Sequence, residues 1–116
     1  MAFTDSELAE HLKVIEGILW TRRRPPLNLR DKMREGQRVT GQAIEFFFLR
    51  PAFERPGELS ESSIAKVQYV RTQNSWRIFW KRADGKWWAY KPHPEALTLA
   101  DALHVINADA FGCFFG

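Results

Sequence analysis

The chain has 116 residues, the usual size of one domain, so we expect a single domain over residues 1–116. A hydrophobic fraction of 45% excludes a disordered chain, and no apolar run approaches the roughly 20 residues that cross a bilayer. The net charge of +3 is a mild basic bias that permits an anionic partner without demanding one. A lone cysteine and the lack of a signal-peptide pattern predict a cytoplasmic protein.

An amphipathic helix is the first predicted element, within residues 1–24. Thr4 and Glu7 have the spacing of a capping box at its start. The helix should end between Trp20 and Arg23, because Pro25-Pro26 cannot continue it. One apolar stripe recurs at helical spacing, formed by Leu8, Leu12, Ile15 and Leu19.

The middle of the chain, residues 38–91, has the composition of an antiparallel sheet. Residues 27–35 favour a short helix that ends at Gly36. Residues 39–49 are rich in β-branched and aromatic side chains, which predicts the first strand. Residues 51–63 have the composition of a loop.

Three more predicted strands follow. Residues 64–72 and 76–81 alternate apolar with polar side chains, and residues 86–91 continue the pattern. Asp84-Gly85 predicts a type I′ hairpin turn between the last two strands. Pro92 and Pro94 end the sheet region.

A closing helix and tail are predicted over residues 98–116, with Thr98 and Asp101 at the helix start. The predicted fold is therefore α+β, a four-stranded antiparallel meander packed by an N-terminal and a C-terminal helix. Helices on one face of the sheet are the simplest packing, although cover on both faces remains an alternative.

Three stretches and two single residues together resemble a known family. They are Ile64–Arg71, Trp76–Asp84, Trp87, Tyr90 and Ala108–Gly116, which ends in an aromatic-Gly-Cys pattern. They are similar to a family of short bacterial proteins known only as a domain of unknown function, family 3024. The resemblance implies no activity, ligand or site residue.

Catalytic and metal sites have little support in the sequence. Cys113 has no histidine at a fixed spacing, and His11, His93 and His104 are scattered along the chain. Neither phosphate-binding glycine pattern occurs. We expect no metal and no cofactor, and we expect Cys113 to be a small, partly buried side chain.

The clearest functional suggestion is a basic and aromatic sheet surface. If Trp76, Ile78 and Trp80 face the core, their neighbours along the strand face outward. Trp87 and Trp88 are consecutive, so one of them must also face outward. The candidate site residues are Lys66, Gln68, Arg77, Phe79, Lys81 and Trp88.

Three functions are consistent with the sequence, and the first two use this surface. The first hypothesis is a non-enzymatic binding or interaction module, with a homodimer or another protein as partner and no membrane. A single-stranded nucleic-acid binder is the alternative, with rings stacking on bases and cations following phosphates. A small enzyme with Cys113 as nucleophile is the third, and a merely solvated face is the competing interpretation.

Overall fold

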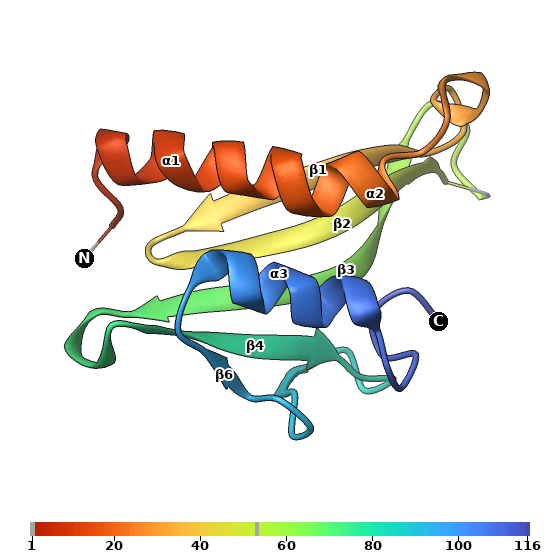
Figure 1. The fold of residues 1–116 in the computed structure, drawn as a ribbon. Helices are drawn as coiled ribbons and strands as arrows, with labels where there is room; N and C mark the ends of the chain where they lie inside the picture. Colours follow the sequence, from red (N-terminus) through yellow and green to blue (C-terminus); the bar gives the residue numbers. More distant parts are fainter. Residues whose placement is uncertain (1, 53) are drawn as a thin grey trace.

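The computed structural model describes residues 2–52 and 54–116 and arranges them as helices layered on a twisted antiparallel sheet (Figure 1). The helical layer contains α1 (Asp5–Ile15), a π-helical turn (Glu16–Trp20), α2 (Thr21–Arg23) and α3 (Leu99–Ala108). Single 3₁₀ turns lie at Leu27–Leu29 and Arg71–Gln73. The strands are β1 (Arg34–Thr40), β2 (Ala43–Pro51), β3 (Leu59–Val70), β4 (Ser75–Lys81), β5 (Trp87–Ala89) and β6 (Glu95–Ala96).

The sheet confirms the predicted α+β class but not the predicted number of strands. Among the described residues it has six strands, in the order β1-β2-β3-β4-β5, with β6 beside β4. All neighbouring pairs are antiparallel, so the meander is correct and four strands is wrong. Helices lie at both ends of the chain, as predicted.

One additional strand comes from the region before residue 40. The predicted helix over residues 27–35 is wrong, because only Leu27–Leu29 forms a 3₁₀ turn and β1 begins at Arg34. A tight turn at Gly41, whose φ is +59°, then joins β1 to β2, where one strand was predicted. Edge strand β1 is largely exposed, so it lacks the alternation that identifies a half-buried strand.

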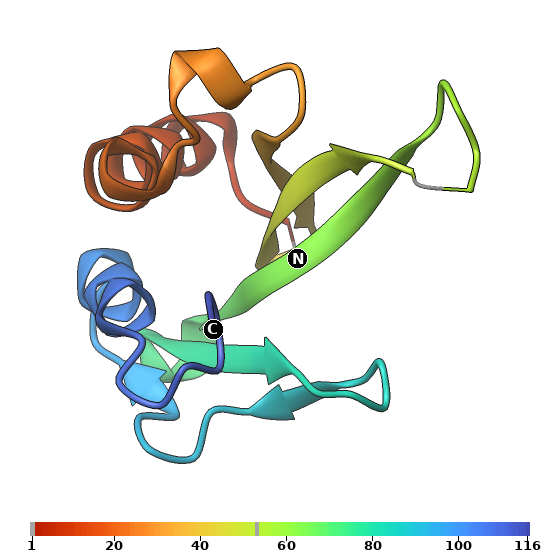
Figure 2. The ribbon, with the colours of Figure 1, turned by 90° about the vertical axis from the view of Figure 1, so that its right-hand side faces the viewer.

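Strand β3 is longer than predicted, and its two halves have different neighbours. The predicted loop over residues 51–63 is wrong at both ends, because β2 continues to Pro51 and β3 starts at Leu59. Residues 66–70 pair with β4, whereas residues 59–63 and Ala65 pair with β2 alone. A bulge opposite Phe46 and Phe47 marks the change. The β2–β3 and β4–β5 hairpins diverge from this point (Figure 2).

The N-terminal helix begins and ends where the sequence predicts. Thr4 Oγ1 accepts from the amide of Glu7 at 3.1 Å, and the carboxylate of Glu7 accepts from the amide of Thr4 at 2.9 Å, which completes the capping box. The helical residues end at Arg23, and the chain is extended from Arg24 into the prolines. The π-helical turn places the consecutive residues Leu19 and Trp20 both in the core.

The chain end folds back around one aspartate. Thr98 caps α3 by accepting from Asp101 at 3.0 Å, which confirms the predicted start. Asp109 ends α3 in the left-handed region, with φ of 42°. Its carboxylate accepts from the amides of Phe114 and Phe115, each at 2.9 Å. These bonds hold the rings of Phe114 and Phe115 against the core.

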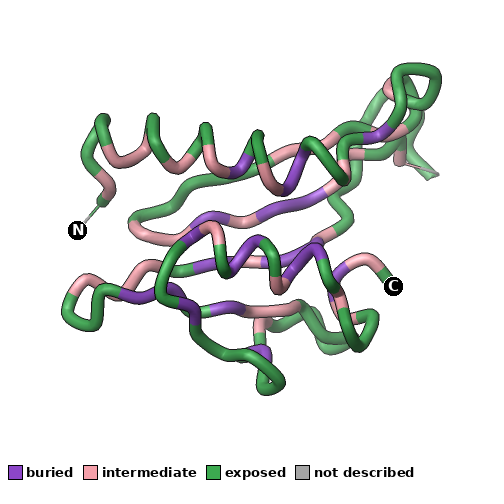
Figure 3. The backbone as a smooth tube through the Cα atoms, viewed as in Figure 1, coloured by how far each residue is buried: buried purple, intermediate pink, exposed green. Residues whose placement is uncertain are grey.

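The core lies between the helices and the face of the sheet that they cover, here called the inner face (Figure 3). One continuous cluster joins residues of α1, the π-helical turn, α3 and strands β2 to β4. Each large side chain buried in it contributes roughly 1.5–3 kcal/mol. Its largest fully buried members are Phe46, Ile15, Leu19, Ile44, Ile78, Leu103, Ile106 and Val67.

Candidate binding surface on the outer sheet face

Strand β4 alternates between the two faces as the sequence predicts. Trp76 and Ile78 are buried on the inner face, and Trp80 packs against the same core. Arg77 and Lys81 are exposed on the opposite, outer face, and Phe79 is half-buried there. No helix formed by the described residues covers this outer face (Figure 2). It is therefore the surface on which the sequence-predicted cations and rings can meet a partner.

Neighbouring strands add their side chains to the outer face through the register. Lys66 of β3 lies directly opposite Phe79, and Gln68 lies opposite Arg77. Directly opposite residues of an antiparallel pair project from the same face. Five of the six predicted site residues therefore share this surface: Lys66, Gln68, Arg77, Phe79 and Lys81.

Trp88 is the exception, and its predicted place on the outer face is wrong. It lies opposite Trp80 in the register and so projects toward the helix side, where it is 43% exposed. Its indole N–H donates to the carboxylate of Asp84 at 3.0 Å. Trp87 takes the outward position instead, opposite Lys81.

The turn between β4 and β5 explains this exchange. A two-residue turn at Asp84-Gly85 would pair Lys81 with Trp88. The structure instead closes the turn with Arg82 opposite Lys86, joined by a 3.1 Å backbone bond, and only Gly85 has a positive φ. The type I′ turn is therefore wrong, and the three-residue loop shifts the register by one residue. Such a shift moves every side chain of the strand to the other face.

Two lysines lie over the outer aromatic rings. The ammonium of Lys66 is 5.4 Å from the ring centre of Phe79 and 5.7 Å from that of Trp87. The ammonium of Lys81 is 5.4 Å from the same Trp87 ring. Distances under about 6 Å are those of a cation–π contact. We call these four residues, Lys66, Phe79, Lys81 and Trp87, the lysine–tryptophan cluster.

Two carboxylates of the outer face, those of Glu45 and Glu61, are already engaged by Arg38. Glu45 lies opposite Lys66 in the register, yet its carboxylate accepts from Arg38 at 3.1 Å. Arg38 also forms an ion pair with Glu61. Among the described residues, neither lysine of the cluster forms an ion pair. Their two positive charges are thus available to an outside anion.

Arg77 and Ser63 border the cluster on its two sides. The ammonium of Lys81 lies 3.5 Å from the hydroxyl of Ser63 on β3, across the point where β3 and β4 separate. Arg77 lies opposite Glu95 of β6, and the two line a hollow of about 240 Å³ with Phe79 and Pro94. Glu95 offsets part of the Arg77 charge, so the lysines are the stronger anion-binding groups.

Cys113 lacks the features of a reactive nucleophile. Its side chain is half-buried beside Trp80, Trp88 and Arg82, which line a hollow of about 260 Å³. Burial first, and then the nearby Asp109 carboxylate, raise the pKa of the Cys113 thiol. A thiol with a raised pKa is mostly protonated at neutral pH and reacts slowly.

His11 is occupied by packing rather than chemistry. Its ring meets Phe3 at 4.8 Å and Trp76 at 5.0 Å between centroids, both edge-on. Burial lowers the pKa of His11, although Glu7 and Glu10 oppose the shift. In the part of the chain that the structure describes, no three His, Cys, Asp or Glu residues gather into a metal-binding group.

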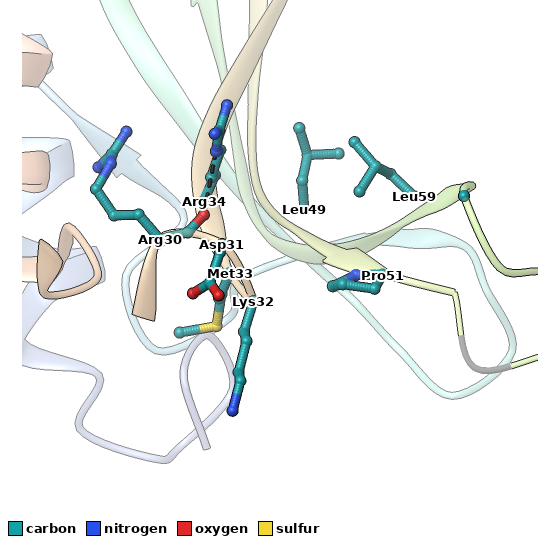
Figure 4. A pocket seen from close by; sticks show the side chains of 9 residues that line it. Arg30, Asp31, Lys32, Met33, Arg34, Leu49, Pro51 and Leu59 are labelled. Carbon is teal, nitrogen blue, oxygen red and sulfur yellow. Dashed lines mark hydrogen bonds between the residues drawn. The ribbon is translucent and has the colours of Figure 1, made fainter. Parts of the chain in front are cut away.

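A third hollow, of about 350 Å³, lies between the Arg30–Arg34 turn and the ends of β2 and β3 (Figure 4). Arg34 Nε donates to the carbonyl of Arg30 at 3.1 Å in its wall. The side chains of Lys32 and Arg34 point in opposite directions (Figure 4). A ligand site needs polar groups that converge, so this hollow is a weaker candidate than the outer face.

The fold and surface together define a small α+β protein with a basic, aromatic sheet face. The chain belongs to the family described as Domain of unknown function (DUF3024), whose pattern matches residues 3–116. No curated protein and no solved structure matches the chain. None of the helices built from the described residues has the length and apolar character to cross a membrane.

Proposed function

We propose that this protein is a non-enzymatic binding module that holds an anionic partner protein on its outer sheet face. The observation that supports it is the lysine–tryptophan cluster, in which two ammonium groups lie over Trp87 without a carboxylate. Trp87 and Phe79 supply contact area, and the lysines supply attraction and orientation. Glu45, the carboxylate opposite Lys66, bonds to its other cross-strand neighbour, Arg38 of β1, and so leaves the charge of Lys66 unpaired among the described residues.

A hydrophobic homodimer fits the outer face less well. Phe79 and Trp87 are both half-buried, and lysine ammonium groups lie over their rings. An obligate dimer interface needs a largely apolar patch that is depleted of lysine. Pairing this face with a copy of itself would also bring like charges together.

Single-stranded nucleic acid is the second candidate, favoured by the same combination of rings and cations. Base stacking would require the lysines to leave the rings that they now cover. Carboxylates of a protein need no such movement, because they meet the ammonium groups where they are. The arrangement therefore favours an acidic protein over a nucleic acid.

Binding of a polyanion to a lysine variant tests the proposal. We expect poly-glutamate to change the tryptophan fluorescence at low salt and the effect to weaken at physiological salt. Lys66→Gln combined with Lys81→Gln should lower the affinity at least about tenfold, because both charged contacts are lost.

The matched control removes two exposed lysines that also form no ion pair in the described residues, Lys13 and Lys32. Lys13→Gln with Lys32→Gln changes the net charge equally and should leave most of the affinity. Equal losses in the two double variants would show that net charge alone attracts the polyanion, and the proposed site would be wrong.

A further inference from the structure

We propose that the anionic partner is an extended acidic peptide segment that adds as a further strand to the free edge of β3, residues 59–63. This inference rests on the proposed function and names the form in which the partner is bound. The carboxylates of that peptide would lie on Lys81 and Lys66 at the end of the edge.

The edge is free because β3 continues past its partner. Its pairing with β4 stops at Lys66 opposite Phe79, whereas its pairing with β2 runs on to Leu59 opposite Pro51. In a strand, the backbone groups of alternate residues point to alternate sides. Alternate residues within 59–63 therefore present their amides and carbonyls on the side that β4 has left. This free edge is about 17 Å long at the rise of a strand.

The described parts of the chain do not cover this edge. Leu59 to Ser62 are exposed, and Ser63 is half-buried. The tail ends nearby (Figure 2), but the amides of Phe114 and Phe115 both donate to Asp109. The tail therefore does not use these donors to pair with β3.

The composition of the edge permits pairing. Proteins protect exposed edges with proline, charged side chains or bulges. Strand β1, the outer edge of the sheet, carries Arg34, Glu35 and Arg38. The β3 edge carries three serines and a single charge, Glu61, which Arg38 holds in an ion pair. Exposed edges of this kind bind extended peptides by main-chain hydrogen bonds.

The position of the lysines gives the added strand its charge preference. Lys81 lies 3.5 Å from Ser63, so its ammonium lies at the last residue of the free edge. Lys66 lies where β4 rejoins β3. A strand on this edge that carries a carboxylate on its outer face would reach both ammonium groups at one end. The edge provides main-chain bonds and the cluster selects acidic sequences.

The test compares two blocked peptides of alternating glutamate and valine. One is unmodified, and the other is N-methylated on alternate residues, so that it keeps its charge and loses its main-chain donors along one side. We expect the unmodified peptide to bind at least about tenfold more tightly, since several main-chain bonds are lost. Amide hydrogen exchange of Ser60–Ser63 should slow on binding, with the exposed edge β1 as an internal control that does not change.

The outcomes separate the two proposals. If both peptides bind equally, and Lys66→Gln with Lys81→Gln weakens both, the binding module stands and strand addition is wrong. If neither peptide binds but a thymidine oligonucleotide does, with the same lysine dependence, the partner is a nucleic acid and the inference is overturned. If Ser60–Ser63 are protected without peptide in a concentration-dependent manner, a second copy of the chain occupies the edge, which also overturns it.

Discussion

The two faces of the sheet use the same residue types in opposite ways. On the inner face, Trp20 meets Phe46 edge-on at 6.1 Å, and both rings are almost entirely buried. On the outer face, Trp87 and Phe79 are half-buried and their neighbours are ammonium groups rather than other rings. Aromatic content alone therefore does not reveal which rings stabilise the fold and which are available to a partner. The burial of each ring makes the distinction, since guanidinium groups also lie over rings that pack on the core, such as Phe115 and Trp80.

The largest expected effect compares one phenylalanine from each face. Phe46→Ala removes a fully buried ring and should lower the free energy of unfolding by about 3–5 kcal/mol. Phe79→Ala removes a half-buried ring and should cost only about 1 kcal/mol. Urea unfolding of the two variants measures both values. Similar losses would mean that Phe79 is part of the stabilising core, and the contrast between the faces would fail.

Gly36→Ala probes a tightly packed ring of the outer face, that of Phe47. Phe47 is 8% exposed, and its ring lies across Gly36 of β1, with the Arg38 guanidinium 5.0 Å from the ring centre. A Cβ at position 36 would lie 2.4 Å from Phe47 Cε2, so the ring must move. We expect a loss of about 1–3 kcal/mol in thermal or urea unfolding.

Gly17→Ala is the matched control for Gly36→Ala. Gly17 is helical and has nothing within 4 Å of its added Cβ, so alanine should leave stability unchanged or raise it slightly. If Gly36→Ala were as harmless as Gly17→Ala, the packing of Phe47 on β1 would not contribute to stability. The aromatic rings of the outer face would then contribute little to the stability of the fold.

The smallest expected effect concerns the ion pair at the edge of the inner face. Arg71 donates to both carboxylate oxygens of Glu7, at 2.8 and 3.0 Å, and this bond, with one from the Thr4 amide, lowers the pKa of Glu7 to about 2. A carboxyl whose pKa is lower in the folded state stabilises the protein above its unfolded pKa. That contribution is lost as the pH falls from about 4.5 toward 2.

Thermal unfolding across this pH range measures the Glu7 contribution. The wild-type midpoint should fall more steeply with pH than that of Glu7→Gln, which has no carboxylate to protonate at this position. Glu10→Gln, an exposed change on the same helix, should keep the wild-type slope. Parallel slopes for the wild type and Glu7→Gln would contradict the prediction.

Much of the fold was predictable because local signals agree with tertiary structure. Thr4, Glu7 and Thr98 cap helices through bonds to their own neighbours, so sequence spacing is enough to find them. The alternation of β4 likewise follows from one buried face. These features depend on residues close together along the chain.

The missed features depend on partners far along the chain. The β1–β2 turn carries Gly41 without the Asn-Gly or Asp-Gly pair that marks tight hairpins, and β1 has little apolar alternation. The start of β3, Leu59–Ser63, is mostly polar because it has a neighbour on one side only. This segment is a strand because it pairs with β2, and its own sequence does not indicate that pairing.

The candidate surface was predictable in composition but not in register. The outward residues of β4 follow from its own alternation, and Lys66 follows from that of β3. Whether Trp87 or Trp88 faces outward depends on a single residue in the loop after Arg82. No property of the two tryptophans themselves decides it.

The π-helical turn at Glu16–Trp20 has a consequence for insertions and deletions. A regular helix advances about 100° per residue, so removing one residue here would rotate α1 by that angle relative to α2. His11 and Glu7 would then leave Trp76 and Arg71, which they now contact. The length of this segment is therefore fixed by packing at both of its ends, whereas the exposed residues 54–58 should accept changes in length.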